Sequence, residues 1–491
     1  MPTIDELAAF CKRKGFVYPT AEIYGGLSGF FDFGPLGAEL KSNIKKEWWK
    51  FHVHQRDDIV GMDGSIITNP KVWDASGHTA HFEDLMLTCS KCGQKVRADQ
   101  FLEQALKMQA EGLTAEEVNG LVKKHKLTCP SCKSAFREVQ PFNLMFSTMV
   151  GPKEDSSAKA YLRPETAQLM FADFKLVADN ARMKLPFGIA QMGKAFRNEI
   201  SPRDFLFRSR EFEQMELEFF INPKDPKCPF LDEVKEHILL VCSEEMQKKG
   251  DAPKKMSVAD ALRKGVIKAE WHAYWLAVEH QWFISLGANP ERFRIRQHVQ
   301  RERSHYASET WDLEYEFPFG WKELLGMANR ADFDMQQHMK SSKKDLSLFD
   351  EETKQKVIPH VVAEPSLGVE RAFLVFLFDA YTDDKERGNI VLKLSPKLAP
   401  IKVGVFSLVN KLNEEAKKVY DLIRNDIFCT FDTGGSIGRR YARADEQGIP
   451  YCVTIDFDTL KDKAVTVRDR DTTKQVRIKI SELKSYLLAK C

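Results

Sequence analysis

The chain has 491 residues, too many for one hydrophobic core, so about two to four domains are expected. With 43% hydrophobic and 29% charged residues and a net charge of +2, the composition excludes a fibrous or disordered chain, and neither indicates nor excludes a nucleic-acid partner. No apolar run is long enough to span a membrane, and the amphipathic start, Met1–Phe16, lacks a signal core, so a cytoplasmic protein without membrane contact is expected.

Residues 1–88 predict a helix, a Gly-rich segment at Tyr24–Leu40 and a second helix over Leu40–His54. Residues 89–132 are predicted to be an insertion, because two cysteine pairs flank a charged helical stretch. Strands and helices resume over 133–220, and residues 225–310 are predicted to be mostly helical.

Residues 311–394 alternate strands and turns with one apolar helix, and the proline-containing segment Lys393–Lys402 is predicted to be a linker. Beyond it, buried-type strands alternate with amphipathic helices over residues 395–491. This alternation predicts a small C-terminal α/β domain.

The ten cysteines include two Cys-x-x-Cys pairs, Cys89 with Cys92 and Cys129 with Cys132, separated by 36 residues. Two such knuckles form the tetrahedral thiolate set of a structural zinc ion, although the separation is longer than in common zinc ribbons. The alternative is a metal-free hairpin with reduced cysteines. The other six cysteines are isolated, which favours free thiols over a disulfide framework.

The segment Phe196–Phe220 predicts a hairpin whose second strand alternates between two chemically different faces. One face carries Arg208, Arg210, Phe212, Gln214, Glu216 and Glu218, and the other Ser209, Glu211, Glu213, Met215, Leu217 and Phe219. Cations, an aromatic ring and carboxylates in that order suit a ligand such as ATP beside an amino acid. The alternative is an amphipathic hairpin with solvated charges.

Three motifs in this order resemble the signatures of class II aminoacyl-tRNA synthetases. Arg197, Glu199, Arg208 and Phe212 match the second signature, Gly368 and Arg371 the third, and Pro35 begins the first. Longer stretches, among them "RPETAQ" from Arg163, "FGWKELLGMANRADFD" and "EPSLGVER", resemble the dimeric form of glycyl-tRNA synthetase over nearly the whole chain.

The resemblance implies an α/β protein with an α+β catalytic core, that is, an antiparallel class II sheet flanked by helices. It implies a catalytic domain formed by residues 1–88 and 133–394, with a helical insertion at about 225–310. Residues 89–132 would be the cysteine-knuckle insertion and residues 395–491 an anticodon-binding α/β domain. A homodimer is implied by the first signature.

The implied activity is that of a glycine–tRNA ligase. Glycine and ATP would form glycyl-adenylate and pyrophosphate, with Mg²⁺ on the phosphates, and the glycyl group would pass to the 3′ end of tRNA(Gly). Arg197, Arg371 and Glu323 would be the catalytic residues, with Glu323 and the backbone of Leu324 holding Mg²⁺. The implied ATP-binding residues are Arg197, Asn198, Glu199, Phe207, Arg208, Ser209, Arg210, Glu211, Phe212, Glu323, Leu324, Gly368, Val369, Glu370 and Arg371.

For the amino acid, the resemblance implies a crowded acidic pocket around the ammonium group of glycine, too small for an alanine methyl group. The implied residues are Arg97, Glu165, Phe212, Glu213, Gln214, Met215, Glu216, Glu364, Pro365, Ser366, Leu367 and Gly368. Alternatively, some of these carboxylates anchor the others or pair with Arg163, and Arg371 pairs with Glu370.

Three other hypotheses remain at this point. The chain could be a class II synthetase for threonine, proline or serine, or a nucleic-acid-binding accessory subunit, although such a subunit would be expected to lose the ATP arginines. Synthesis of diadenosine tetraphosphate would be a side activity. In the C-terminal domain, Arg439, Arg440, Arg443, Arg468, Arg470 and Arg477 either contact tRNA or form an ordinary solvated face.

Overall fold

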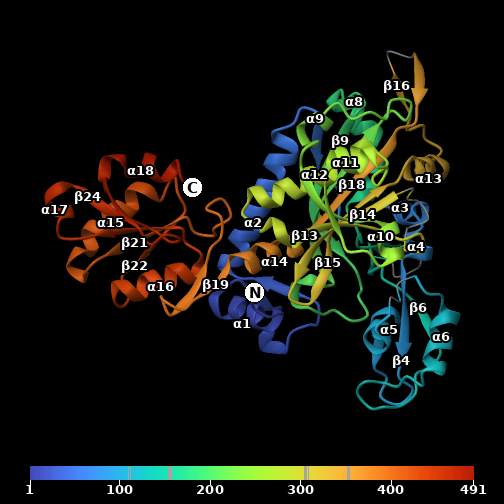
Figure 1. Ribbon diagram of the computed structural model, residues 1–491, viewed down its shortest axis with the longest axis horizontal. Coiled ribbons are helices and arrows are strands. Elements are labelled where there is room, and N and C mark those ends of the chain that lie inside the picture. The colour runs from blue at the N-terminus through green and yellow to red at the C-terminus, as the bar shows by residue number, and fades with distance from the viewer. Residues whose placement is uncertain (109, 111, 153–157, 303–306, 308, 351–353) are drawn as a thin grey trace.

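The computed structural model describes residues 1–491 except 109, 111, 153–157, 303–306, 308 and 351–353. Figure 1 shows three parts: a central body, an insertion that projects from it, and a C-terminal domain on the opposite side of the body. Among the described residues, no helix has both the length and the apolar character that a membrane crossing requires.

The central body is built on a nine-stranded sheet in the order β12-β11-β13-β14-β15-β18-β10-β9-β3. Its neighbours pair antiparallel, except that β11 pairs with β13 and β3 with β9 in parallel. The strands are β12 (Lys254–Ser257), β11 (Ile238–Cys242), β13 (Phe293–Gln297), β14 (Glu309–Phe317), β15 (Gly320–Asn329), β18 (His360–Gly368), β10 (Glu211–Ile221), β9 (Phe187–Phe196) and β3 (Ile59–Met62). The expected antiparallel core is thus confirmed.

Three long helices contribute apolar side chains to the core that covers this sheet. Helix α14 (Val369–Ala380) follows β18 directly, and α2 (Pro35–Trp49) begins with a proline, whose fixed φ and missing N–H suit a first turn. Gly37 lets α2 approach the N-terminal segment, because a Cβ there would lie 1.8 Å from the carbonyl oxygen of Phe16. Helix α12 (Glu270–Ser285) is buried on nearly every side.

The segment 225–310, expected to be a helical insertion, also supplies β11, β12 and β13 to the central sheet. The expectation was therefore incomplete: short apolar runs such as Ile238–Cys242 fit a buried strand as well as a buried helix. The helices in this segment are α9 (Leu231–Val234), α10 (Glu244–Lys249), α11 (Val258–Arg263) and α12.

The remaining elements of the body are short. The helices are α1 (Ile4–Lys14), α3 (Lys71–Ala75), α4 (His78–His81), α7 (Ala167–Ala172), α8 (Phe174–Ala181), α13 (Phe333–Ser342) and a π-helix at Lys50–His54. The two-stranded ladders are β1 (Val17–Pro19) with β2 (Phe31–Phe33), β7 (Ser147–Met149) with β8 (Lys159–Tyr161), β16 (Leu348–Asp350) with β17 (Gln355–Val357), and β19 (Tyr381–Asp384) with β20 (Asn389–Leu392). Single turns of 3₁₀-helix occur at Glu22–Tyr24, Phe205–Phe207 and Pro290–Arg292.

The insertion is a small unit with its own sheet and core. Its strands are β4 (Glu83–Thr88), β5 (Lys95–Arg97) and β6 (Gln140–Asn143) in the order β5-β4-β6, and its helices are α5 (Ala98–Leu106) and α6 (Ala115–Lys124). Because β4 and β6 pair with each other, the unit extends on both sides of the 89–132 segment expected from the cysteines.

The C-terminal domain is a five-stranded sheet in the order β22-β21-β23-β24-β25, with its own apolar core. The strands are β21 (Val403–Ser407), β22 (Cys429–Asp432), β23 (Tyr451–Ile455), β24 (Ala464–Asp469) and β25 (Gln475–Lys479). The helices are α15 (Asn413–Ile423), α16 (Ile437–Gln447), α17 (Thr459–Asp462) and α18 (Ile480–Leu488), with a 3₁₀ turn at Asn410–Leu412. The alternating pattern predicted from the sequence is confirmed.

Candidate active site

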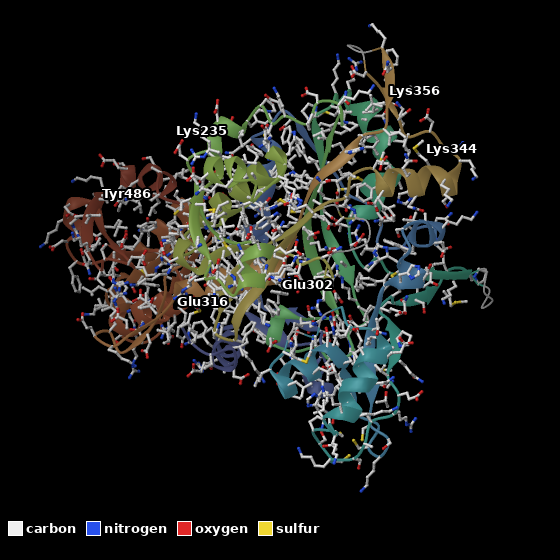
Figure 2. The ribbon with its side chains drawn as sticks, turned by 45° about the vertical axis from the view of Figure 1, so that its right-hand side comes forward. Lys235, Glu302, Glu316, Lys344, Lys356 and Tyr486 are labelled. Carbon is white, nitrogen blue, oxygen red and sulfur yellow. The ribbon has the colours of Figure 1, made fainter. Side chains whose placement is uncertain are left out.

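A cavity of about 640 Å³ lies over β10, β14, β15 and the start of α14, and the insertion closes one side of it. Its walls carry charges of both signs, contributed by Arg97, Arg197, Arg208, Arg294, Arg296 and Arg371 and by Asp84, Asp99, Glu199, Asp312, Glu314 and Glu323. In Figure 2 the labelled Glu302, which pairs with Arg296 at 3.0 Å, lies within the central body. A cavity with this charge pattern suits a ligand that is itself strongly charged.

Arg197 enters the cavity from the loop after β9. Its Nε donates to the carbonyl of Pro164 at 3.1 Å, and its guanidinium lies 5.3 Å from the ring centroid of Phe212 and 5.5 Å from that of Phe82. Its two terminal nitrogens have no hydrogen-bond partner within the described part of the chain. The side chain is therefore held in place while its bidentate donor edge remains available for an anion.

Glu199 and Arg208 form the next pair along the cavity. The Arg208 Nε donates to Glu199 Oε2 at 2.7 Å. Burial, reinforced by Asp84, raises the pKa of Glu199 to about 7 even though Arg97 and Arg197 act in the opposite direction. Glu199 can thus accept a hydrogen bond, and it titrates near neutral pH.

Arg371 lies at the start of α14 and pairs with Glu323 of β15, Nη1 to Oε1 at 3.0 Å. The same nitrogen donates to the Glu323 carbonyl at 2.9 Å, and the guanidinium lies 4.6 Å from the ring centroid of Phe207. The alternative pairing of Arg371 with Glu370 does not occur, because Glu370 instead accepts from Lys41 at 2.7 Å.

Beside Glu323 lies Asp312 of β14, which the sequence analysis did not identify. The register sets Asp312 opposite Gly326, where a Cβ would lie 3.9 Å from Asp312 Oδ1 and 3.7 Å from Glu323 Oε1. Burial and the charge of Glu323 raise the pKa of Asp312 to about 6, opposed by His298 at 2.7 Å. The same ladder skips Leu324 in a β-bulge, which releases its backbone from the strand pairing.

A second group of acids lies behind the cavity. One of them, Glu216, is on the same face of β10 as Gln214, and Gln214 lines the cavity. Glu216 is 1% exposed, and its Oε2 accepts hydrogen bonds from the backbone N–H of Thr166 at 3.1 Å and from the Thr166 hydroxyl. Gln214 Nε2 donates to Ser366 Oγ at 3.0 Å and approaches Glu216 Oε1 at 3.4 Å. Ser366 and Gln214 therefore connect the cavity to the acidic group.

Arg330 is the cation that binds Glu364 in this group, together with Asp334. Its Nη1 donates to both oxygens of Glu364 at 2.9 and 3.0 Å, and its Nε and Nη2 donate to Asp334 at 2.6 and 2.8 Å. Burial raises the pKa of Glu364 to about 8 together with the charges of Glu216 and Glu165, against the effect of Arg330. The charge of Glu364 therefore depends on which of its acidic neighbours carries a proton.

Glu165 faces the same group from the loop before α7. Its Oε2 lies 3.3 Å from His78 Nε2, and its Oε1 accepts from Gln168 Nε2 at 3.1 Å. Burial would raise the pKa of Glu165, but His78, Arg330 and Gln168 outweigh it and lower that pKa. Glu165 is thus held ionised.

Arg163, the expected alternative partner of these acids, does not bond to them. Its guanidinium donates to the carbonyls of Lys194 and Gly64, both at 2.6 Å, and to Gln191 Oε1 at 3.1 Å. Gly193 makes room for it, because a Cβ there would lie 2.0 Å from an Nη of Arg163. The sequence analysis missed Arg330, His78 and Thr166; the one available signal was the i, i+4 spacing of Arg330 and Asp334.

The structure brings many of the predicted site residues to one cavity. Those that line it are Arg97, Arg197, Glu199, Phe207, Arg208, Ser209, Phe212, Gln214, Glu323, Ser366, Gly368, Glu370 and Arg371. Glu165, Glu216 and Glu364 form the buried group behind it. Arg97 is held by Asp84 at 2.9 Å and Asp99 at 2.7 Å, on the wall that the insertion provides.

The other predicted residues are not among those that line the cavity. Met215, Leu324, Leu367 and Val369 are buried in the core of the body, and Asn198 and Pro365 are also outside the lining. Glu211 pairs with Lys194, and Glu213 with Lys41 and Lys45, on the opposite face of β10. Arg210 donates to the carbonyls of Glu199 and Ser28 and thereby fastens two loops together.

The four knuckle cysteines meet at the tip of the insertion. Cys89 Sγ lies 3.4 Å from Cys132 Sγ, and Cys92 Sγ lies 3.6 Å from Cys129 Sγ. All four sulfurs lie within 4.8 Å of one another. Four thiolates on one tetrahedral zinc ion would be about 3.8 Å apart, so the donor set fits zinc.

In the C-terminal domain, most of the basic residues considered for tRNA contact have partners in the protein itself. Arg468 pairs with Asp445 at 2.8 Å, Arg443 with Asp432 at 2.5 Å and Arg477 with Asp456 at 2.7 Å. Arg440 and Arg470 are buried and donate to backbone carbonyls. Arg439, which is exposed, remains the best placed of the six for an external anion.

A family model described as an anticodon binding domain matches residues 402–490. Proteins named glycine–tRNA ligase from Caldanaerobacter subterraneus subsp. tengcongensis and Acetivibrio thermocellus are each 45% identical to this chain, over 99% of it and 98% of their own length. The protein of that name from Bacillus thuringiensis is 44% identical over 99% of both chains. The chain belongs to the glycine–tRNA ligase family.

Family membership confirms several expectations. The chain is an ATP-dependent aminoacyl-tRNA ligase, and the class II core with a C-terminal anticodon-binding domain is the fold predicted from its motifs. The relatives are named for glycine and not for threonine, proline or serine, and they are named as ligases and not as accessory subunits. The predicted glycine–tRNA ligase activity is thereby confirmed.

Proposed function

We propose that this chain activates glycine in the cavity described above and transfers it to tRNA(Gly), with the predicted residues in the following roles. The observation that carries this assignment is the direct connection of two sites. The arginine-rich cavity, suited to a nucleoside triphosphate, is joined through Gln214 and Ser366 to a buried acidic pocket suited to an ammonium group.

In the first step the carboxylate oxygen of glycine attacks the α-phosphorus of ATP and pyrophosphate leaves. This displacement requires alignment and charge stabilisation rather than a protein nucleophile. The terminal nitrogens of Arg197 would hold the α-phosphate, and Phe212 would stack on adenine. Arg208 and Arg371 would meet the γ-phosphate once they leave Glu199 and Glu323, their partners in the structure.

Magnesium fits the carboxylates beside these arginines. Glu323 and Asp312 lie side by side in the cavity wall, and hard oxygen donors of this kind are the ligands that Mg²⁺ prefers. When bound, Mg²⁺ would supply positive charge to the phosphate oxygens. Arg371 and His298, the present partners of these two carboxylates, would keep their charges balanced in its absence.

Selection of glycine would come from the acidic pocket. Glu165, Glu216 and Glu364 would take the ammonium group, and Gln214, bonded to Ser366 and Glu216, would limit the space beside it. An alanine methyl group would overlap these side chains. Alanine has the same ammonium and carboxylate groups as glycine, so the discrimination would rest on this overlap.

ATP–pyrophosphate exchange tests this assignment without tRNA. We expect exchange with glycine, and exchange with alanine or serine lower by at least about 100-fold in kcat/KM. Glu216→Gln should raise the glycine KM by at least about tenfold and change the ATP KM little, because it removes one pocket charge. Equal exchange with alanine, or a Glu216→Gln variant with normal glycine KM, would contradict the assigned pocket.

We also propose one structural zinc ion on Cys89, Cys92, Cys129 and Cys132. The close sulfur contacts and the small core of the insertion support it, since a unit of this size gains much of its stability from a metal. The ion would have no open coordination position and would act only on the fold of the insertion. The metal-free hairpin remains the alternative.

Metal analysis of the purified protein should therefore find about one zinc per chain. Cys132→Ser should lower this to near zero and expose the insertion to proteolysis, whereas Cys491→Ser, at a cysteine outside the group, should leave the zinc content unchanged. Wild-type protein that is folded, active and free of zinc after purification without chelator would instead support the metal-free hairpin.

For tRNA, the anticodon-binding domain would contact the anticodon stem-loop, with Arg439 as an exposed cation available to phosphate. A cytoplasmic location belongs to the same proposal. It is supported by the cysteines, since none of the ten, all of which the structure describes, forms a disulfide, and this fits a reducing compartment.

We propose further that the chain acts as a homodimer. Three apolar side chains near the first signature are strongly exposed in the single chain, Ile23 at 88%, Tyr24 at 86% and Leu27 at 60%. An apolar patch of this kind usually marks an interface. Its position before α2, which begins with Pro35, agrees with a dimer formed through the first signature.

Sedimentation at micromolar concentration should give twice the chain mass of 56.3 kDa. Ile23→Asp should shift the protein towards the single-chain mass, because it places a charge in the interface. Leu488→Asp, at a half-exposed leucine on the C-terminal helix, is the matched control and should not change the mass. A wild-type protein of single-chain mass under these conditions would be evidence against the dimer.

A further inference from the structure

One carboxyl group in the acidic pocket has no role in the scheme above. Glu218 lies on β10 two residues beyond Glu216, on the same face of the sheet. It is 0% exposed, and neither of its oxygens has a hydrogen-bond partner among the residues that the structure describes. A carboxyl group buried in this way is costly to the fold and calls for a physical explanation.

The neighbours of Glu218 are themselves acids. The pairing of Glu216 with Ser366 and of Phe219 with Ala363 sets Glu218 opposite Glu364 on β18. One oxygen from each of Glu216, Glu218 and Glu364 lies within 4.8 Å of one from each of the others. Like charges directly opposite each other on neighbouring strands destabilise a sheet, and more strongly where water is absent.

The charges that surround this trio do not balance it. Arg330 at the end of β15 contributes one positive charge, and it is shared between Glu364 and Asp334 of α13. Glu165, from the loop before α7, adds a further negative charge close to Glu216 and Glu364, and His78 faces Glu165 itself at 3.3 Å. If all three carboxylates were ionised, they would share the single positive charge of Arg330 with Asp334. This is very unfavourable in a buried site, so at least one of the three must carry a proton.

The donors that reach each carboxyl identify the one that holds this proton. Glu364 receives both of its hydrogen bonds from Arg330, and Glu216 receives two from Thr166. Both sets of donors stabilise the ionised form. Glu218 receives none from the described residues, so its ionised form is the least stabilised of the three.

We propose that Glu218 is a positioning residue of the glycine pocket: it stays a neutral carboxylic acid and donates a hydrogen bond from its O–H to the facing carboxylate of Glu364. Small rotations of the two side chains bring the facing oxygens from within 4.8 Å to hydrogen-bonding distance. This inference rests on the proposed glycine pocket. In its support, burial and the charges of Glu364 and Glu216 hold the pKa of Glu218 well above its usual range.

The consequence for the substrate is electrostatic. A donor on the far side of Glu364 stabilises its charge and fixes its orientation, so that its remaining lone pairs face the ammonium group of glycine. Without this donor the pKa of Glu364 would rise, so that Glu364 or Glu216 would take up a proton from solvent, and the pocket would lose negative charge where the substrate needs it.

Two substitutions separate a neutral donor from a charged group. E218M removes the donor while keeping the length of the side chain, and it should raise the glycine KM in ATP–pyrophosphate exchange by at least about tenfold with the ATP KM unchanged. E218Q, which is neutral and keeps a donor, should recover the glycine KM to within about threefold of wild type. If E218Q instead raises the glycine KM as much as E218M does, the charge of Glu218 is required and the proposal fails.

Thermal unfolding without substrate gives a readout that does not depend on activity. The carboxyl of Glu218 ionises freely in the unfolded chain but resists ionisation in the fold, so the folded pKa is raised. Such a group stabilises the fold at low pH and loses that contribution as the pH rises above the unfolded value. Glutamine does not titrate, so the Tm of E218Q minus that of wild type should increase steadily from pH 5 to pH 8.

A Tm difference that is constant or that falls over this range would mean that Glu218 is ionised in the fold, and would overturn the proposal. This comparison also applies if E218M fails to fold. The two experiments also test the glycine pocket and the neutral Glu218 separately. Absence of glycine-dependent exchange in wild type would contradict the proposed pocket, whereas the pH series would still report the protonation of Glu218.

Discussion

Replacing Arg197 by alanine should lower kcat for ATP–pyrophosphate exchange with glycine by about 10³-fold, with a much smaller change in the KM for ATP. The guanidinium is held by Pro164 and by the rings of Phe82 and Phe212, while its terminal nitrogens make no bond to the described residues. A donor aimed in advance at the site of developing charge stabilises the transition state more than the ground state, so the loss appears in kcat. Steady-state exchange kinetics measure it.

Two variants control this experiment. Arg197→Lys keeps the charge but loses the bidentate edge, so its activity should lie between that of alanine and that of wild type. Arg203→Ala removes another arginine of the same cavity, one that already pairs with Asp204 at 3.4 Å, and should reduce kcat by less than about tenfold. If Arg203→Ala and Arg197→Ala had equal effects, the charge of the cavity and not the placement of Arg197 would account for the rate.

Replacing Arg330 by methionine should destabilise the protein by about 3–5 kcal/mol and abolish glycine activation, because it leaves Glu364 and Asp334 buried without their cation. Arg330 is 3% exposed, so solvent cannot replace it. Denaturant unfolding measures the loss. It should be larger at pH 8 than at pH 5.5, since the stranded carboxyls acquire raised pKa values and fold most easily when protonated.

Arg263→Met provides the matched control, because the Arg263 side chain is 74% exposed and its pair with Asp260 lies on the surface. It should leave both stability and exchange activity unchanged. An Arg330→Met protein with the stability of wild type would show that the acids behind the cavity are protonated in the native state, and would remove the support for a negatively charged pocket.

Much of the site was accessible from the sequence because its motifs are local. The spacing of Arg197, Glu199 and Arg208 around one hairpin identified residues that line one cavity, and strand alternation separated Gln214 and Glu216 from the opposite face of β10. The same alternation shows where naming residues by their place in a motif fails. Glu211 and Glu213 were named as site residues because they lie within the motif, but they form ion pairs with lysines on the other face of β10.

The residues that the sequence analysis missed come from elsewhere in the chain. Arg330, His78 and Asp312 acquire their partners only when β15, the α3–α4 region and β14 are brought together. None lies in one of the three class II signatures, and apart from the i, i+4 spacing of Arg330 and Asp334 none carries a local signal of its partner. The segment 225–310 was similarly ambiguous, because a short buried strand and a short buried helix have the same apolar composition.

By itself, the sequence determined the class of the protein, the alternating C-terminal domain, the cysteine knuckles and the arginines of the cavity, because each depends on residues close together in the chain. Only the tertiary structure decided which carboxyls are buried together, which cations bind them and which arginines already pair with acids of the protein. The physical reason is that the charge state of a buried acid depends on burial and on neighbours distant in sequence, as Glu218, Glu364 and Arg330 show.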